Sequence, residues 1–146
     1  MIDSDGTIRW RLHLAAAPAA VYDMLATPAG RRRFWAVSAP DRRDGTIEFH
    51  FHDGSTLTSR VLDATRPARF RLTYFDGSEV TFELMSDGEG GTDLLLTERG
   101  VPEETRIANH AGWVSVLFSL KAAVDHGVDL RNHDPRRTWD RGYVDV

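Results

Sequence analysis

The sequence contains no cysteine, and this absence excludes whole classes of chemistry. Without thiols the chain can form no disulfide, thiolate zinc site or iron–sulfur cluster, and it has no cysteine nucleophile. A chain of 146 residues is nevertheless long enough to bury a sizeable core without such cross-links. The hydrophobic share of 41% is typical of a globular protein, and we expect one domain spanning residues 1–146.

Positive charge and long apolar runs are also scarce. The 18 basic residues are outnumbered by 22 acidic ones, and the net charge of −4 argues against a nucleic-acid partner. No stretch approaches the roughly 20 apolar residues of a membrane span. Residues 1–6 are acidic and lack the apolar stretch of a signal peptide. We therefore expect a cytoplasmic protein with no membrane span.

The order of the hydrophobic patterns predicts an α+β fold. Residues 7–14 alternate strictly between apolar and polar side chains, which indicates a half-buried strand. Two short helices are expected next, joined at Thr27 and Pro28. Five further alternating segments lie within residues 46–99 and are separated by turn signals. Because no crossover helices separate these segments, we expect a curved antiparallel sheet of about six strands.

One long helix is expected from about residue 103 to residue 126. Its apolar stripe contains Trp113, Leu117 and Leu120, so this face should pack on the sheet. Residues 127–146 have no periodicity but contain Leu130, Trp139 and Tyr143. We expect them to form an ordered extension that packs on the domain or against a second copy in a homodimer.

The chain resembles a known superfamily in three segments: APAAVYDMLATPAGRRRFW, GGTDLLLTERGV and NHAGWVSVLFSLKAAVDHGVDLRNHDPRRTWDRGYVDV. The order of elements resembles the helix-grip fold of the START-like, or SRPBCC, superfamily. Within it, the segments resemble the group named after the activator of the heat-shock protein 90 ATPase. The resemblance implies a deep, mostly apolar pocket between the concave sheet face and the long helix. Members bind lipids, sterols or polyketides, some are cyclases, and the eukaryotic namesakes stimulate a chaperone.

The pocket implied by this resemblance would be lined by side chains of the sheet and the helices. We expect ligand contacts from Trp35, Phe49, Phe51, Ser59, Phe70, Leu72, Tyr74, Phe82, Glu98, Arg106, Asn109, His110, Trp113 and Leu117. The aromatic residues among them would equally fill an ordinary core.

The stripe of the long helix becomes polar toward its N-terminus, at Arg106, Asn109 and His110. These side chains would ring the mouth of a pocket and orient a polar ligand group. Alternatively, the first turns of the helix overhang solvent. Glu98 has the strand parity of Leu94, which places its carboxylate on the concave face with Arg106 or His110 as its partner. The alternative is a strand-end carboxylate that is exposed or paired with an arginine.

Three functions follow as hypotheses. The first is a module that binds a small hydrophobic ligand without covalent chemistry. The second is an enzyme resembling polyketide cyclases or dehydratases, in which Glu98 and His110 serve as acid and base, helped by Arg106. The third is an interaction protein that regulates a chaperone. A chaperone partner is not expected, because the fold uses all 146 residues and leaves no separate chaperone-binding domain.

No cofactor or metal is expected. His50 and His52 share one strand face, but this face is opposite to Phe49 and no third ligand has a suitable spacing.

Overall fold

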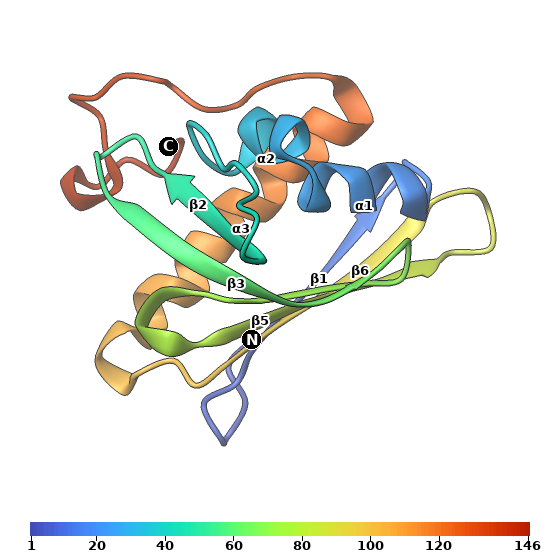
Figure 1. Ribbon diagram of the computed structural model, residues 1–146, viewed down its shortest axis with the longest axis horizontal. Helices are drawn as coiled ribbons and strands as arrows, with labels where there is room; N and C mark the ends of the chain where they lie inside the picture. Colours follow the sequence, from blue (N-terminus) through green and yellow to red (C-terminus); the bar gives the residue numbers. More distant parts are fainter.

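Six antiparallel strands and three α-helices form the fold in a computed structural model that describes residues 1–146 (Figure 1). The strands are β1 (Ile8–Leu14), β2 (Thr46–His50), β3 (Thr56–Thr65), β4 (Arg69–Thr73), β5 (Glu79–Ser86) and β6 (Thr92–Arg99). The helices are α1 (Pro18–Ala26), α2 (Pro28–Phe34) and α3 (Glu103–His126). The predicted α+β class, the strand number and the long C-terminal helix are confirmed.

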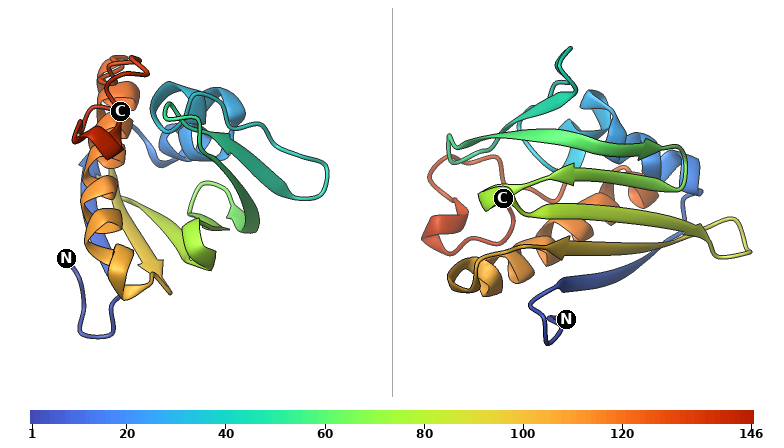
Figure 2. Two further views of the ribbon diagram at one scale, coloured as in Figure 1. Left: turned by 90° about the vertical axis from the view of Figure 1, so that its left-hand side faces the viewer. Right: turned by 60° about the horizontal axis from the view of Figure 1, so that its bottom comes forward.

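The strands form one curved sheet in the order β1-β6-β5-β4-β3-β2, and each neighbouring pair is antiparallel. The first strand therefore pairs with the last, and β2 forms the opposite edge. All three α-helices lie on the same face of the sheet (Figure 2). A cluster of 24 buried hydrophobic residues fills the space between the helices and this face. The predicted stripe of α3 is part of it, since Trp113, Leu117 and Leu120 are all buried.

The local sequence explains why two short helices replace one long helix. Thr27 has an extended backbone with ψ 147°, and its hydroxyl accepts a 3.0 Å hydrogen bond from the amide of Gly30. Pro28 supplies the first residue of α2 without needing a donor of its own. A Cβ atom at Gly30 would lie 2.5 Å from the carbonyl oxygen of Asp23, so only glycine permits this close turn. The turn delivers Trp35 onto the sheet.

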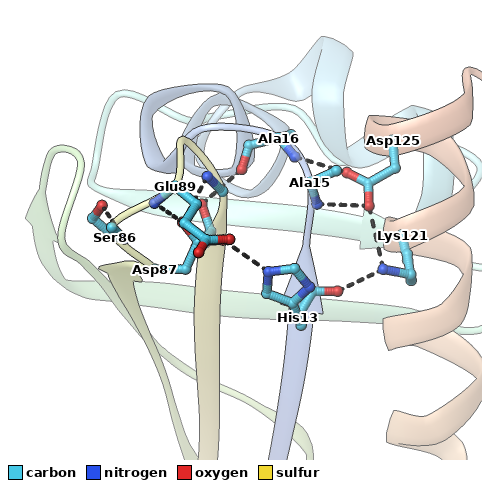
Figure 3. Close-up of polar contacts among 11 residues, drawn as sticks. His13, Ala15, Ala16, Ser86, Asp87, Glu89, Lys121 and Asp125 are labelled. Atoms are coloured by element: carbon cyan, nitrogen blue, oxygen red, sulfur yellow. Dashed lines mark hydrogen bonds and ion pairs between the residues drawn. The ribbon is translucent and has the colours of Figure 1, made fainter.

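The C-terminal half of α3 is fixed to the start of the chain by polar contacts (Figure 3). The carboxylate of Asp125 accepts hydrogen bonds from the amides of Ala15 and Ala16 at 2.9 and 3.0 Å. Lys121 donates to the carbonyl of His13 at 2.6 Å, and the His13 ring contacts Asp87 at 2.9 Å. This end of the molecule is therefore closed.

Residues 128–146, named here the C-terminal segment, fold back on their own chain. The side chain of Arg131 is only 2% exposed and donates to the carbonyls of Ala36 and Arg32 at 2.9 and 2.7 Å. Asn132 donates to Asp145 at 3.0 Å. The segment thus packs on the domain, and its short 3₁₀ turn (Trp139–Arg141) reaches the first half of α3.

Candidate functional site

A cavity of about 280 Å³ lies beside the N-terminal half of α3. This half of the helix is at the lower left of Figure 1. Its wall comes from five parts of the chain: Trp35 after α2; Phe51, His52, Asp53 and Ser55 between β2 and β3; Tyr74 and Phe75 after β4; Ala108, Asn109, Gly112, Trp113, Ser115 and Val116 of α3; and Thr138, Trp139 and Val146 of the C-terminal segment. Elements that are far apart in the sequence therefore meet at one site.

Three aromatic rings, which we call the aromatic floor, form one side of the cavity. The ring centroids of Trp35 and Tyr74 are 6.0 Å apart, those of Tyr74 and Trp113 are 5.0 Å apart, and those of Trp35 and Trp113 are 6.1 Å apart. These distances are those of favourable aromatic contacts. Because the rings brace one another, the floor is preorganised to receive an apolar or planar group.

The hydroxyl of Tyr74 is the polar group of this floor. It accepts a 3.1 Å hydrogen bond from the indole Nε1 of Trp35, and no protein acceptor receives its own hydrogen. Burial raises the pKa of the Tyr74 hydroxyl well above its ordinary value, and the negative charge of Glu98 raises it further. The hydroxyl therefore stays protonated and has one hydrogen bond to donate.

Glu98 lies directly behind the floor and is fully buried, as its inward parity predicts. Its carboxylate accepts hydrogen bonds from Trp113 Nε1 at 2.6 Å, from Ser78 Oγ at 2.7 Å and from Asn109 Nδ2 at 3.3 Å. The alternative of an exposed strand-end carboxylate is wrong. The expected partners, Arg106 and His110, do not contact it.

Arg106 turns away from the cavity. Its guanidinium donates to the carbonyl of Val101 at 3.2 Å, and it packs under Gly6 so closely that a Cβ there would lie 2.7 Å from Cζ. Gly6 has φ 82°, a conformation that glycine adopts without strain. The N-terminal loop therefore covers Arg106, which the sequence pattern had placed at the mouth.

His110 faces β1 and not the cavity. Its ring stacks on Trp10 with centroids 4.6 Å apart, and its Nε2 lies 2.9 Å from the amino nitrogen of Met1. Burial and the positive amino group together lower the pKa of His110. Successive residues of a helix point about 100° apart, so Asn109 facing Glu98 turns His110 to the side. Glu98 and His110 share no cavity, and the predicted acid–base arrangement of these two residues is wrong.

The structure divides the remaining predicted residues between the cavity and the core. Five of the predicted residues line the cavity: Trp35, Phe51, Tyr74, Asn109 and Trp113. Six are instead buried in the core: Phe49, Ser59, Phe70, Leu72, Phe82 and Leu117. The indole of Trp35 lies 4.8 Å from the Phe49 ring and 5.6 Å from the Phe82 ring, so it fills the space that a deep pocket would occupy.

Sequence reasoning missed several residues of the cavity wall. Phe75 follows inward-facing Tyr74 and so has the outward parity of a strand, but the chain leaves the strand at Thr73 and a 3₁₀ turn redirects it. Thr138 and Trp139 lie in an aperiodic segment, where no pattern gives a direction. The one available signal was the presence of a large aromatic residue, Trp139, in an otherwise polar stretch.

A second groove lies along the outer face of α3 and reaches Trp10 of the edge strand β1. It is lined by Val114 and Phe118 of the helix and by Leu130, Trp139 and Val144 of the C-terminal segment, among others. Phe118 is 57% exposed, and Ile107 on the same helix is 77% exposed. An apolar helix face is therefore left open to solvent.

The curved antiparallel sheet, the long C-terminal helix and the cavity beside it define a helix-grip protein of the START-like class. The chain belongs to the family described as activator of Hsp90 ATPase homolog 1-like protein, whose profile matches residues 15–125. The matched range ends before the C-terminal segment, so Thr138 and Trp139 of the cavity wall lie outside it.

Solved structures show the same fold. The protein SSP2350 from Staphylococcus saprophyticus is 20% identical, with a TM-score of 0.73 over 84% of this chain and 93% of that one. The Aha1 dimer from Colwellia psychrerythraea is 22% identical, with a TM-score of 0.69 over 83% of this chain and 97% of that one. DynU16, described as a putative protein in the dynemicin biosynthetic locus, is 21% identical, with a TM-score of 0.71 over 86% of this chain and 49% of that one.

No curated protein matches the chain. None of its helices combines the length and the apolar character that crossing a membrane requires.

Proposed function

We propose that the protein binds a small, mainly apolar organic molecule in the cavity beside α3, without covalent chemistry. The observation that carries this proposal is the aromatic floor with a Tyr74 hydroxyl whose hydrogen has no protein acceptor. Binding sites of this kind are apolar cavities with a few polar groups that fix orientation. The ligand would stack on Trp35 and Trp113 and accept a hydrogen bond from Tyr74.

Lipid-, sterol- and polyketide-like molecules are the candidate ligands. The volume of about 280 Å³ favours a compact molecule or one end of a longer one. The description of DynU16 as a putative protein in a biosynthetic locus supports a small organic molecule as the ligand class.

Native mass spectrometry of freshly purified protein tests this proposal, because a retained ligand would appear as a defined added mass. Gly112 offers a matched pair of variants, since it lines the cavity and a Cβ there would meet no atom within 4 Å. Gly112→Phe should fill the cavity and abolish the added mass, whereas Gly112→Ala should retain it. Fluorescence of the apolar dye 1-anilinonaphthalene-8-sulfonate gives the same comparison for an empty cavity. Equal ligand or dye binding by both variants would place binding elsewhere and refute the proposal.

We also propose that a second copy of the chain covers the outer face of α3. The observation is a stripe with alternating spacings of three and four residues: Glu104, Ile107, Ala111, Val114, Phe118 and Lys121. This spacing is that of a helix-pairing seam. The stripe is symmetric about its centre, so two antiparallel α3 helices would place Ile107 against Phe118.

Size-exclusion chromatography with light scattering tests this pairing. Phe118→Glu places a charge in the seam and should convert a dimer into a monomer. Met85→Glu is the matched control, because Met85 is a similarly exposed apolar residue, at 47%, on β5. A monomeric wild-type protein at high micromolar concentration would contradict the proposal.

A further inference from the structure

The charged side chain in the cavity wall is acidic, although Arg131 lies close enough to act on His52 of the wall. Asp53 is the acidic residue of its wall, and no lysine or arginine lines it. His52 also lines it, and burial, with the nearby charges of Arg131 and His133, lowers its pKa, so its neutral form is favoured. The wall itself therefore has no cationic side chain to neutralise an anionic ligand, and the nearby guanidinium of Arg131 is paired with Asp129.

Glu98 adds a buried carboxylate behind the aromatic floor. It is 0% exposed and accepts only neutral donors, from Trp113, Ser78 and Asn109. It takes part in none of the ion pairs of the molecule. Buried carboxylates are normally paired with a cation, so this one lacks its usual counter-charge.

We propose that the cavity selects a compact organic cation, such as a tertiary or quaternary ammonium bearing an apolar group, over neutral and anionic molecules of the same shape. This inference rests on the proposed ligand-binding function and names the chemical class that the same cavity prefers.

Two physical effects favour such a cation. The faces of tryptophan and tyrosine rings attract ammonium groups, and the attraction increases where water is excluded. Three such rings, in mutual contact with centroids 5.0 to 6.1 Å apart, form one side of the cavity. In addition, two cavity residues, Trp113 and Asn109, hold the Glu98 carboxylate immediately behind the wall. Its charge therefore acts on the cavity through protein and not through water. Attraction between charges is screened less in protein than in water.

The Tyr74 hydroxyl does not conflict with a cationic ligand. It can donate its hydrogen to a neutral acceptor on the same molecule, such as an ether or carbonyl oxygen. An anion would also accept this bond, but it would face Glu98 and Asp53 without a lysine or arginine in the wall to offset them. The sign of the ligand's charge is thus the property by which the cavity should distinguish cationic, neutral and anionic molecules of the same shape.

Three probes of one shape test the inference: benzyltrimethylammonium, its neutral isostere neopentylbenzene and the anion benzylsulfonate. Binding is followed by intrinsic fluorescence, because Trp35, Trp113 and Trp139 all line the cavity. We expect the cation to bind about tenfold or more tightly than the neutral isostere, and the anion not to bind measurably. Equal binding of the cation and the neutral probe would overturn the inference and leave the proposed function standing. Failure of all three probes to bind would overturn both.

Glu98→Gln removes the buried charge while nearly preserving the shape of the side chain. It should reduce the preference for benzyltrimethylammonium over neopentylbenzene, compared within the same variant, to about twofold or less. Glu83→Gln is the matched control, because Glu83 lies on β5 and points to the opposite face of the sheet from buried Phe82 and Leu84. This control should retain the full preference, and a retained preference in Glu98→Gln would overturn the role of the buried carboxylate.

A measurement on the unmodified protein tests the same inference without relying on a variant that could fail to fold. The cation preference should persist in about 0.5 M salt, because a buried charge is screened much less than an exposed one. Loss of the preference in salt would assign it to surface acidity and overturn the inference.

Discussion

The indole Nε1 of Trp113 donates a 2.6 Å hydrogen bond to the carboxylate of Glu98, which joins the longest helix to the last strand. Because Glu98 is fully buried, the hydrogen bonds of its neighbours replace all of the water that it loses on folding. The same bond fixes the orientation of the Trp113 ring in the aromatic floor. Stability and the shape of the cavity therefore depend on one contact.

Trp113→Phe should weaken the fold by about 2 to 4 kcal/mol, since it removes a donor from a buried carboxylate and also leaves a small void. Urea unfolding measures the loss. Trp10→Phe is the control, because the Trp10 indole donates to the backbone carbonyl of His110 at 3.1 Å in a half-buried position. That variant should lose about 1 kcal/mol, and equal losses in the two variants would contradict the special role of Glu98.

Replacing two glycines by alanine, one at a time, should change the stability of the protein in opposite directions. Gly112 lies within α3 and has open space around a Cβ, so Gly112→Ala should stabilise the protein by about 0.5 to 1 kcal/mol. Gly6 has φ 82° and lies under Arg106, so Gly6→Ala should destabilise it by about 1 kcal/mol or more. Thermal unfolding followed by circular dichroism distinguishes the two. A stabilising Gly6→Ala would show that the N-terminal loop does not hold Arg106 as described.

The fold could be predicted from the sequence because its signals are local. Alternation such as that of residues 7–14 defines a strand by itself, and the Thr27-Pro28 pair separates two helices by backbone chemistry alone. The order of such elements then leaves few topologies. This is why the strands, the helices and the sheet-facing stripe of α3 were all predicted.

The site was less predictable because the periodicity of a strand shows which face a side chain lies on and not how deeply that side chain is buried. Phe49 and Tyr74 both point inward and their rings are in edge contact, with centroids 6.3 Å apart, yet Phe49 is buried in the core and Tyr74 reaches the cavity. The sequence also predicts a charged partner for Glu98, Arg106 or His110, whereas the indole of Trp113 is the group that lies against the carboxylate. No pattern in the sequence places Trp139 over the cavity.

The contacts between the C-terminal half of α3 and residues 13–16 should stabilise the fold only while the carboxylate of Asp125 is ionised. Burial acts to raise the pKa of Asp125, but the amides of Ala15 and Ala16 and the Lys121 ammonium outweigh it and hold the pKa below the ordinary 3.8. Its contribution to stability is therefore present above about pH 4 and is lost as the pH falls through the lower, folded-state pKa. Asp125→Asn should cost about 1 to 3 kcal/mol at pH 7.

Urea unfolding at pH 7 and again at about pH 2 checks the role of Asp125, because the gap between wild type and Asp125→Asn should narrow in acid. Asp93→Asn serves as the control, since Asp93 is exposed on β6 and should change stability by less than about 0.5 kcal/mol. A gap that does not change with pH would show that the charge of Asp125 is not what matters.

The last prediction concerns the contact between the C-terminal segment and the turn after β2. His52 Nε2 and His133 Nδ1 are 2.9 Å apart, and His133 Nε2 lies 2.7 Å from Asp129. Two facing ring nitrogens share one hydrogen, so the contact requires at least one neutral ring. Burial lowers the pKa of His52, and the charges of Arg131 and His133 lower it further, whereas Asp129 and Asp53 oppose this shift.

Because the folded-state pKa of His52 lies below the ordinary 6.5, the contact stabilises the fold fully above pH 6.5 and loses this effect as the pH falls through the folded-state value. We expect residues 129–139 to exchange amide hydrogens faster at pH 5.5 than at pH 7.5, after correction for intrinsic rates, while the buried part of α3 does not. His52→Asn should remove this pH dependence, because the titrating ring is gone. His126→Asn, at the exposed end of α3, should retain it.

Since Trp139 belongs to both the C-terminal segment and the cavity wall, release of the segment at pH 5.5 should also weaken the binding of a neutral probe. This weakening is expected in the wild-type protein and not in His52→Asn. If exchange of residues 129–139 is the same at both pH values in wild type, the histidine pair does not control the segment.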